Sequence, residues 1–250
     1  PSRRPALLPG SFNPPTKAHL ALAGAALATG SIDRLDFLLA SRTVNKEHIE
    51  GASLSDRLLL LEALVADRPE LGVVFVNRGL YVDQAEIIRA ALPPLDELTF
   101  VVGFDKIVQI FDPRYYQERD SSLHRLFALA RFLVAPRGSA DLDDLRCLLE
   151  RSENRRYANR ISPLDLACDY RQMSSSRLRA HDLGALHDAP RIVRQFARET
   201  GAYGGLGKTE NSSMEERYSR REHVLDVAES ERVSLTTPAA FRMAVRKGLP

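Results

Sequence analysis

Five short apolar runs, each of strand length, recur along the first 136 residues of the chain. The runs are PALLP, RLDFLLA, GVVFVN, LTFVVG and RFLVAP. Between them, apolar residues return every three or four positions, which is the spacing of a helix with one buried face. Apolar strands alternating with such helices indicate a parallel sheet covered on both sides. The pattern predicts an α/β fold with a Rossmann-like, doubly wound parallel sheet that binds ligands beyond the carboxyl ends of its strands.

The first two expected helices each carry one apolar stripe that would face the sheet. The stripes are Leu20, Ala23, Gly24 and Leu27 in the first helix and Leu54, Leu58, Leu61 and Val65 in the second. Further helices are expected near residues 83–91, 141–151, 175–182 and 186–200. The pattern ends at about Tyr203, where the glycine- and serine-rich stretch GGLGKTENSS begins. We therefore expect one globular domain over residues 1–203 and a charged linker and tail over 204–250, either helical or partly disordered and peripheral to the domain.

Composition narrows the class of protein. The 250-residue chain has a formal net charge of +2, which does not favour a general binder of nucleic acid or membranes. No apolar stretch is long enough to span a bilayer. Cys147 and Cys168 show no metal-binding spacing and suit a reducing compartment. The expected location is cytoplasmic, with nuclear access left open.

The stretch PGSFNPPTKAH is a stiff corner between the first strand and the first helix. Gly10 allows a tight turn, two prolines follow, and Thr16 is a good N-cap. His19 then falls in the first helical turn. Because a helix N-terminus presents backbone N–H groups and a positive dipole end, this corner is expected to bind an anion, with phosphate the obvious candidate.

A second stretch, QMSSSRLRAHDL, repeats this chemistry. Three serines, Ser174 to Ser176, stand at the expected start of a helix, with Arg177 and Arg179 in its first turn. Cations are electrostatically misplaced at that end unless an anion is bound there. Hydroxyls, backbone N–H groups and a guanidinium together predict a clamp for a polyphosphate.

The two stretches resemble the paired signatures of the nucleotidyltransferase superfamily. GSFNPPTKAH is similar to its G-x-F-x-P-x-H/T-x-x-H motif, and MSSSRLR resembles its I-S-S-T-x-I-R motif. The segment VGFD at 102–105 is similar to a G-x-D motif, and PRIVRQFARETGAY resembles the end of the catalytic domain. Over residues 5–203 the chain most resembles the nicotinamide or nicotinate mononucleotide adenylyltransferases.

This resemblance implies that the 5′-phosphate of a mononucleotide attacks the α-phosphorus of ATP and releases pyrophosphate. Since the nucleophile is already an anion, catalysis needs alignment and charge neutralisation rather than a general base. Mg²⁺ is expected as a cofactor with ATP, held by phosphates and water, and no protein metal site is expected.

The resemblance also implies roles for individual residues. Gly10, Ser11 and Phe12 would lie against the nucleotide, and Gly103 and Asp105 would line the ribose or base region. Thr16 and His19 would bind phosphates, with His19 donating to an α-phosphate oxygen. Ser175, Ser176 and Arg179 would hold the β- and γ-phosphates. Thr16, His19 and Arg179 are thus the expected catalytic residues, together with Lys46.

Lys46 and Arg57 are also expected to bind the acceptor, although a solvated surface cation is an equal alternative for each. The family commonly stacks the pyridine ring on a tryptophan, and this chain has none. The segment FDPRYY offers Phe111, Tyr115 and Tyr116 instead, with core packing as the alternative.

Several other readings remain open. A cytidylyltransferase or a pantetheine-phosphate adenylyltransferase would use the same fold, and a nucleotide-binding module without transfer activity would keep the same motifs. GLGKT resembles the end of a P-loop, but Ala202 stands where that motif needs glycine and no strand precedes it. The expected partners are small molecules, ATP and a mononucleotide, with a homo-oligomer left open.

Overall fold

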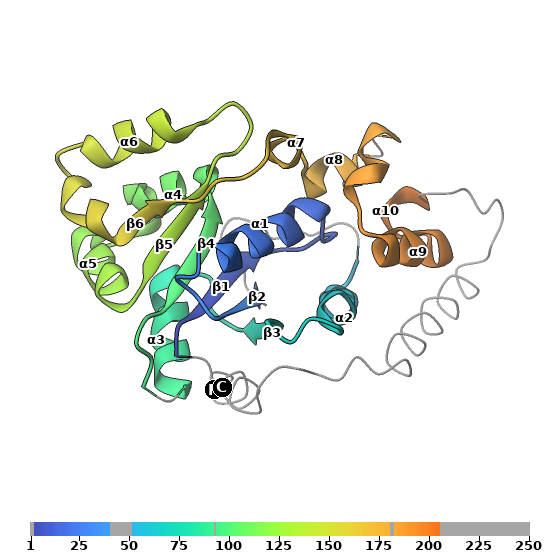
Figure 1. The fold of residues 1–250 in the computed structure, drawn as a ribbon, viewed down its shortest axis with the longest axis horizontal. Coiled ribbons are helices and arrows are strands. Elements are labelled where there is room, and N and C mark those ends of the chain that lie inside the picture. The colour runs from blue at the N-terminus through green and yellow to red at the C-terminus, as the bar shows by residue number, and fades with distance from the viewer. Residues whose placement is uncertain (1–2, 41–51, 93, 181–182, 206–250) are drawn as a thin grey trace.

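The computed structural model describes residues 3–40, 52–92, 94–180 and 183–205. Within these ranges the strands are β1 (Pro5–Gly10), β2 (Arg34–Ala40), β3 (Leu71–Val76), β4 (Thr99–Gly103), β5 (Arg131–Ala135) and β6 (Ile161–Pro163). They form one parallel sheet in the order β3-β2-β1-β4-β5-β6 (Figure 1). The predicted doubly wound fold and its five strands are confirmed. The sequence pattern missed β6, which is only three residues long.

The helices are α1 (Lys17–Ala28), α2 (Leu54–Val65), α3 (Tyr81–Ala91), α4 (Phe104–Phe111), α5 (Arg119–Leu129), α6 (Leu142–Glu150), α7 (Cys168–Arg171), α8 (Ser175–Arg179), α9 (Arg191–Thr200) and α10 (Ala202–Gly205). Short 3₁₀ helices are η1 (Pro113–Tyr115), η2 (Arg155–Arg160) and η3 (Leu183–Asp188). The predicted helix at 186–200 divides into η3 and α9, and the one at 175–182 ends at Arg179. In the described part of the chain, no helix is both long enough and apolar enough to cross a membrane.

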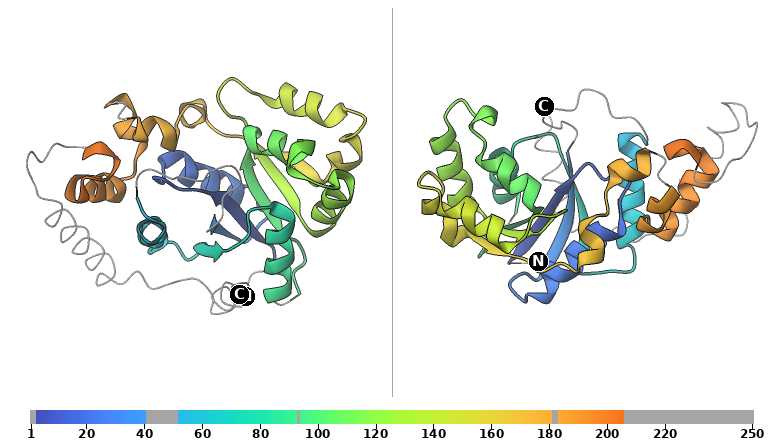
Figure 2. Two further views of the ribbon diagram at one scale, coloured as in Figure 1. Left: turned by 180° about the vertical axis from the view of Figure 1, so that it is seen from behind. Right: turned by 90° about the horizontal axis from the view of Figure 1, so that it is seen from above.

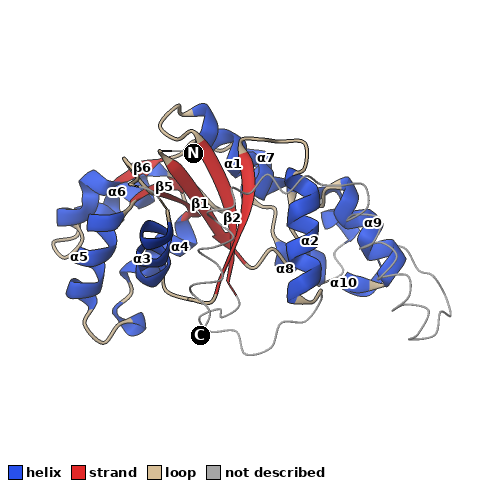
Figure 3. Ribbon diagram, turned by 90° about the horizontal axis from the view of Figure 1, so that it is seen from below, coloured by secondary structure: helices blue, strands red, loops and turns tan. Residues whose placement is uncertain are grey.

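Alternate residues of each strand pack on opposite faces of the sheet, as the period of a strand requires. In β1, Leu7 faces the layer formed by α3, α4, α5 and α6, whereas Ala6 and Leu8 face the layer that contains α1 and α2. Figure 3 shows the sheet between these two helical layers. Coverage of both faces explains why the strands are continuous apolar runs.

The predicted stripe of α1 is confirmed in part. Ala23 is buried, and Leu20 and Leu27 pack, partly buried, against the same core cluster, but Gly24 is exposed. The stripe also omitted the buried residues Ala18, Leu22 and Ala26. The helix is almost entirely alanine and leucine, and such a sequence leaves no polar face by which the buried face can be recognised. Small alanines on the buried face let the helix lie close to the sheet.

The predicted stripe of α2 is confirmed, but the helix has a second apolar face. Leu61 and Val65 pack toward the sheet, while Leu60 belongs to a third cluster with Val193 and Phe196 of α9. Figure 2 shows α9 beside α2, at the edge of the molecule opposite α5 and α6. This third cluster also contains Leu178 of α8. It therefore fixes the serine-rich second motif relative to the sheet.

The predicted boundary between domain and tail falls within α10, which ends at Gly205. Tyr203 is buried in the third cluster. Residues 206–250, which make up nearly all of the predicted tail, lie outside the described residues.

Candidate active site

A cavity of about 370 Å³ opens at the carboxyl ends of the central strands. Its floor includes Leu8, Pro9 and Gly10 of β1 and Val102 and Gly103 of β4. β1 pairs with β2 on one side and with β4 on the other, so the strand order reverses here. Loops leave such a reversal in opposite directions, which is why ligands of doubly wound sheets bind at this place.

The loop from β1 to α1 is shaped around the ring of Phe12. Phe12 has φ 45°, a left-handed conformation that is strained for a bulky residue. Its ring lies edge-on to Phe37 and to His19, with centroids 5.5 and 5.1 Å apart. A Cβ at Gly10 would stand 2.8 Å from the Cζ atom of Phe12. Glycine is therefore required at position 10 because an aromatic ring occupies the space of a side chain.

Thr16 and His19 fix each other at the start of α1. Thr16 is the N-cap, and its backbone N–H donates to Nδ1 of His19 over 2.9 Å, with the Thr16 hydroxyl 2.8 Å from the same nitrogen. Since Nδ1 accepts from the backbone, the proton of the neutral ring resides on Nε2. Burial, reinforced by the charge of Arg137, lowers the pKa of His19 to about 4. His19 is thus a neutral imidazole whose Nε2–H is the donor available to the cavity.

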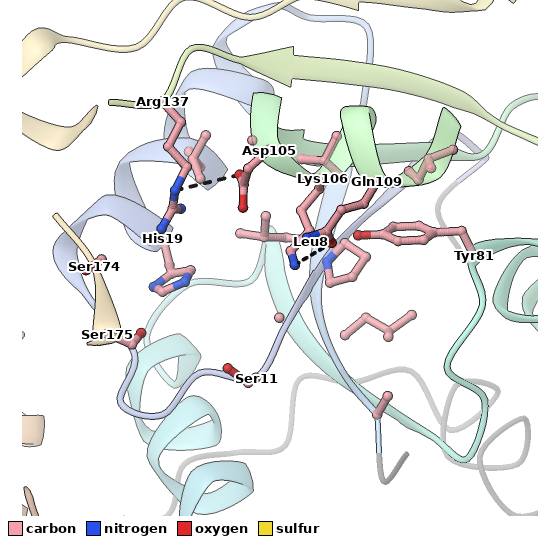
Figure 4. Close-up of a pocket in the computed structure, with 18 of the residues that line it drawn as sticks. Leu8, Ser11, His19, Tyr81, Asp105, Lys106, Gln109, Arg137, Ser174 and Ser175 are labelled. Atoms are coloured by element: carbon pink, nitrogen blue, oxygen red, sulfur yellow. Dashed lines mark hydrogen bonds and ion pairs between the residues drawn. The ribbon is translucent and has the colours of Figure 1, made fainter. Parts of the chain in front are cut away.

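The serine-rich motif at α8 contacts the β1–α1 loop directly. The hydroxyl of Ser175 donates to the carbonyl of Pro14 over 2.7 Å, across 161 positions of sequence. Arg179 donates from Nη1 to the carbonyl of Asn13 and from Nη2 to the hydroxyl of Ser176, the latter over 3.2 Å. Figure 4 shows Ser174 and Ser175 facing the same cavity as His19. The two motifs thus form one wall.

The charges at the two helix starts differ from those of the helices between them. Neither α1 nor α8 has an acidic residue in its first turn. Each of the helices α2 to α6 has at least one: Asp56, Asp83, Asp105, Asp120, and Asp143 with Asp144. Acidic residues at that place stabilise a helix, so their absence at both motifs is consistent with anion-binding N-termini.

Arg137 is a cavity residue that the motifs did not indicate. It follows β5, and its Nε lies 3.6 Å from a carboxylate oxygen of Asp105 in the first turn of α4. In Figure 4 the guanidinium of Arg137 stands beside the ring of His19. Arg137 directly follows the end of a predicted strand, and that position could have indicated it. The cation and His19 together can stabilise a charged phosphoryl group.

The opposite side of the cavity is aromatic. Tyr81, Tyr115 and Tyr116 line it, and the ring of Tyr81 packs edge-on against Phe100. Burial raises the pKa of Tyr81 well above its usual range, so its hydroxyl remains protonated. Lys106, also on this side, donates to Oε1 of Gln109 over 3.0 Å (Figure 4). This side offers flat surfaces suited to a ring rather than to a polyphosphate.

Most of the site residues predicted from the sequence line this one cavity. They are Gly10, Ser11, Thr16, His19, Gly103, Asp105, Tyr115, Tyr116, Ser174, Ser175, Ser176 and Arg179. Lining residues that the sequence did not indicate include Tyr81, Gln84, Lys106 and Arg137. Each of these four follows a strand or lies on the helix after it, but none belongs to a compact motif.

Other predicted residues lie elsewhere. Phe111 is buried in the core and stacks on Phe127, so the expected contact with an acceptor does not fit its position. Arg57 is buried and donates to the carbonyl of Ser11 over 2.8 Å, so it supports the loop from behind. Phe12 likewise lies beneath His19 rather than among the lining residues. Lys46 lies outside the described residues.

The described residues include no group of three histidine, cysteine, aspartate or glutamate side chains placed to hold a metal ion. Asp105 is the carboxylate that lines the cavity in the described ranges, and it pairs with Arg137. A divalent cation would therefore have to take most of its ligands from a bound phosphate chain and water.

A parallel sheet with a cavity where its strand order reverses, walled by two helix N-termini without acidic residues, is the arrangement typical of nucleotide-binding α/β proteins. The sequence model of the cytidylyltransferase-like family matches residues 7–181. The chain belongs to this family, and the resemblance to nucleotidyltransferases is confirmed.

Among curated relatives, a Schizosaccharomyces pombe protein named as a candidate nicotinamide mononucleotide adenylyltransferase is 31% identical over 115 residues, which are 45% of this chain and 44% of that protein. A Frankia casuarinae protein named probable nicotinate-nucleotide adenylyltransferase is 31% identical over 129 residues, which are 50% of this chain and 64% of that protein. The chain thus spans less than two thirds of the length of these relatives.

Solved structures of Plasmodium falciparum nicotinic acid mononucleotide adenylyltransferase share the fold. The complex with NaAD superposes with a TM-score of 0.56 at 15% identity, covering 71% of this chain and 83% of that one. The complex with APC gives 0.61 at 13% identity, covering 80% of this chain and 97% of that one. At these identities the likeness concerns the fold alone.

Proposed function

We propose that this protein is an adenylyltransferase that joins the AMP part of ATP to a pyridine mononucleotide, nicotinamide or nicotinate mononucleotide, and releases pyrophosphate, in the biosynthesis of NAD. The observation that carries this proposal is the direct contact between the β1–α1 loop and α8 in one wall of the cavity. Names of relatives at about 31% identity support the choice of pyridine mononucleotide.

In the proposed reaction, a 5′-phosphate oxygen of the mononucleotide attacks the α-phosphorus of ATP. A new P–O bond forms as the bond between the α-phosphorus and its bridging oxygen to the β-phosphate breaks, and pyrophosphate leaves with the electron pair. No proton has to be removed from the nucleophile. The protein therefore accelerates the reaction by aligning two anions and by stabilising charge on the transferred group.

The phosphate side of the cavity supplies these two effects. Nε2–H of His19 would donate to a nonbridging oxygen of the α-phosphate, and Arg137 would neutralise charge beside it. Ser175, Ser176 and Arg179 would bind the β- and γ-phosphates, since hydroxyls and a guanidinium bind anionic oxygens well. The contact of Arg179 with the carbonyl of Asn13 holds this clamp against the loop.

Mg²⁺ is proposed to enter with ATP. When bound to the triphosphate it would neutralise charge on the phosphate oxygens, a task that no cluster of carboxylates in the described ranges takes over. Asp105 would then be left to pair with Arg137 and to line the ribose region.

The aromatic side of the cavity would receive the acceptor. Tyr81 lies across the cavity from His19 (Figure 4), Tyr115 and Tyr116 also line the cavity, and aromatic rings pack favourably on the flat pyridine ring. In this proposal the tyrosines would take the role of the tryptophan that the family commonly uses. A cytoplasmic location, with nuclear access left open, and a homo-oligomer stay predictions from the sequence.

The test is a product assay. The protein is incubated with magnesium ATP and a panel of acceptors, and products are identified by mass. We expect a pyridine adenine dinucleotide and an equal amount of pyrophosphate. The panel includes pantetheine phosphate, and CTP replaces ATP in a parallel set. A product in one of those reactions alone would assign the other chemistry, and nucleotide binding without pyrophosphate release would indicate a binding module.

A further inference from the structure

Lys106 is an exposed cation that lines the cavity from α4. Its Nζ donates to Oε1 of Gln109 over 3.0 Å, about one turn further along the helix. In the view of Figure 4 the ammonium reaches into the cavity between the ring of His19 and the ring of Tyr81. The side chain therefore stands where a ligand that contacts both sides of the cavity must pass.

The charge of Lys106 is not neutralised by the described part of the chain. Its hydrogen bond goes to a neutral amide, and no described carboxylate forms an ion pair with it. The adjacent carboxylate of Asp105 lies 3.6 Å from Nε of Arg137 and pairs there instead. An ammonium carries three N–H donors, so two remain beside the one that Gln109 takes. These donors and the charge suit an anionic group of a ligand.

Lys106 differs in position from the other cations of the lining. Within the described ranges these are Arg137 and Arg179. Arg137 stands beside His19 in Figure 4, and Arg179 donates to the carbonyl of Asn13. Both arginines thus lie on the side proposed for the triphosphate. A second anion, the 5′-phosphate of the acceptor, enters the proposed reaction, and its charge also has to be offset by the protein.

The proposed position of the acceptor brings its 5′-phosphate to Lys106. The pyridine ring would lie at Tyr81, and the phosphate has to reach the α-phosphate of ATP beside His19. The ribose and its phosphate then span the part of the cavity into which Lys106 points (Figure 4). We propose that Nζ of Lys106 donates to a nonattacking oxygen of this phosphate and thereby binds the acceptor. This inference rests on the proposed function and deepens it, because it adds a recognition group for the acceptor.

The contact acts on binding rather than on the chemical step. A 5′-phosphate has three terminal oxygens, so one can attack while another accepts from Lys106. As the new P–O bond forms, the attacking phosphate loses negative charge. Its interaction with a cation is therefore no stronger in the transition state than in the bound substrate, and such an interaction lowers KM without raising kcat.

The test compares the steady-state constants of the wild-type protein with those of Lys106→Met, which nearly keeps the length of the side chain and removes the charge. We expect KM for the mononucleotide to rise by about tenfold or more, the scale of one charge-assisted hydrogen bond. KM for ATP and kcat should each stay within about twofold of the wild-type values. Lys106→Arg keeps the charge and is expected to recover most of the affinity.

A matched control removes an exposed cation at the opposite end of the sheet. Arg68 precedes β3, so it lies at the amino ends of the strands, whereas the cavity lies at their carboxyl ends. Arg68→Met should leave these constants unchanged. In Lys106→Met, an unchanged KM for the mononucleotide or a rise in KM for ATP alone would overturn the inference. A failure of Lys106→Arg to recover affinity would indicate a packing role and would also overturn it.

A comparison of ligands shows which part of the acceptor Lys106 contacts. The 5′-phosphate is common to nicotinamide and nicotinate mononucleotide, so Lys106→Met should raise KM for both by the same factor. A loss confined to nicotinate mononucleotide would place Lys106 at the ring carboxylate and contradict the phosphate contact. The nucleoside that lacks the 5′-phosphate serves as a competitive inhibitor, and its inhibition constant should be equal in both proteins. An inhibition constant that rises as much as KM would contradict the contact as well.

The inference can fail separately from the proposed function. If no acceptor yields a dinucleotide, the proposed function is rejected, and calorimetry with nicotinamide mononucleotide and a nonhydrolysable ATP analogue tests the contact. Tighter binding to the wild-type protein than to Lys106→Met, by a similar factor, would support the role of Lys106. Equal binding to both proteins, or binding to neither, would reject it.

Discussion

His19 combines three properties that suit a donor to a transferred phosphate. Thr16 holds its Nδ1, the ring of Phe12 packs against it, and burial keeps it neutral at pH 7. We expect His19→Ala to fold and to reduce the rate of adenylyl transfer by about a hundredfold or more, the scale seen when one preorganised donor to a charged transition state is removed. Pyrophosphate release measures the rate and a thermal melt measures folding. An unchanged rate would show that the reaction takes place elsewhere.

The lowered pKa of His19 also makes a prediction about stability. Above pH 6.5, the ordinary value, the ring is neutral in both the folded and the unfolded chain and adds no pH dependence. Between pH 6.5 and about 4 the unfolded chain binds a proton that the folded protein does not, so the free energy of unfolding falls as the pH is lowered. The total is on the order of 3 kcal/mol.

Denaturant unfolding at several pH values checks this effect. The free energy of unfolding of His19→Ala should decline less steeply between pH 6.5 and 4.5 than that of the wild-type protein. Parallel curves for the two proteins would mean that His19 titrates normally in the folded state.

Single residues could be predicted where their chemistry is readable locally. Gly10, Thr16 and His19 lie within ten positions, and turn, cap and donor follow from that short stretch. Gln84 and Arg137 could not be found in this way. Gln84 becomes notable because the loop carbonyls occupy its Nε2 and leave its Oε1 unpaired among the described residues, and Arg137 because Asp105 of α4 and His19 of α1 lie close to it in the fold.

At the scale of elements, α2 connects the β1–α1 loop to the third cluster. Arg57, in the first turn of α2, donates to the carbonyl of Ser11 and, over 3.2 Å, to that of Ser53. It is 4% exposed and does not line the cavity. The sequence left two alternatives open for Arg57, namely binding of the acceptor and a solvated surface position. The structure agrees with neither alternative.

We therefore expect Arg57→Ala to act through the loop. Two hydrogen bonds from a buried cation are lost, which should lower the free energy of unfolding by about 1–3 kcal/mol. The loop that carries Ser11 contributes to the common floor of the cavity, so KM should rise for ATP and for the mononucleotide together. Steady-state kinetics with each substrate varied in turn gives the two values. Arg68→Ala, at an exposed position beyond the end of α2, is the matched control.

A rise in KM for the mononucleotide alone, with KM for ATP unchanged, would contradict this interpretation. It would return Arg57 to the role of an acceptor-binding residue that the sequence suggested.

A helix could be predicted from the sequence when its polar and apolar positions are clearly distinct. α3 and α6, with mixed polar and apolar positions, were expected within two residues of their observed bounds. α1 was expected, but its predicted stripe included the exposed Gly24 and missed the buried Leu22 and Ala26, since alanine and leucine surround the helix. α5 was missed because RDSSLHRLFAL begins with four polar residues that are typical of a loop. Its buried residues become apolar partners only when the sheet is present.

At the scale of the whole molecule, the sheet and its two layers follow from the repeated apolar runs, whereas the third cluster does not. Leu60, Leu178 and Phe196 come from three segments whose contact no local pattern encodes. This cluster brings the serine-rich motif to the β1–α1 loop, and so it converts two separate anion-binding stretches into one wall. Short local motifs thus determine which groups the site contains, whereas packing between distant segments brings these groups together.

The last prediction concerns the C-terminal segment and follows from the extent of the third cluster and of the cavity lining. Among the described residues, the last member of the third cluster is Tyr203, α10 ends at Gly205, and the last residue that lines the cavity is Arg179. A chain that ends at Gly205 should therefore keep the core and the phosphate wall. We expect it to unfold at a similar temperature and to release pyrophosphate at a rate within about twofold of the full chain, because the sequence predicts that the tail is peripheral and a peripheral tail contributes little to either. Ending the chain at Thr200 instead removes Tyr203 from the cluster and should lower the melting temperature. If the chain ending at Gly205 melts normally but transfers slowly, residues 206–250 take part in the reaction and the division at the end of α10 is wrong.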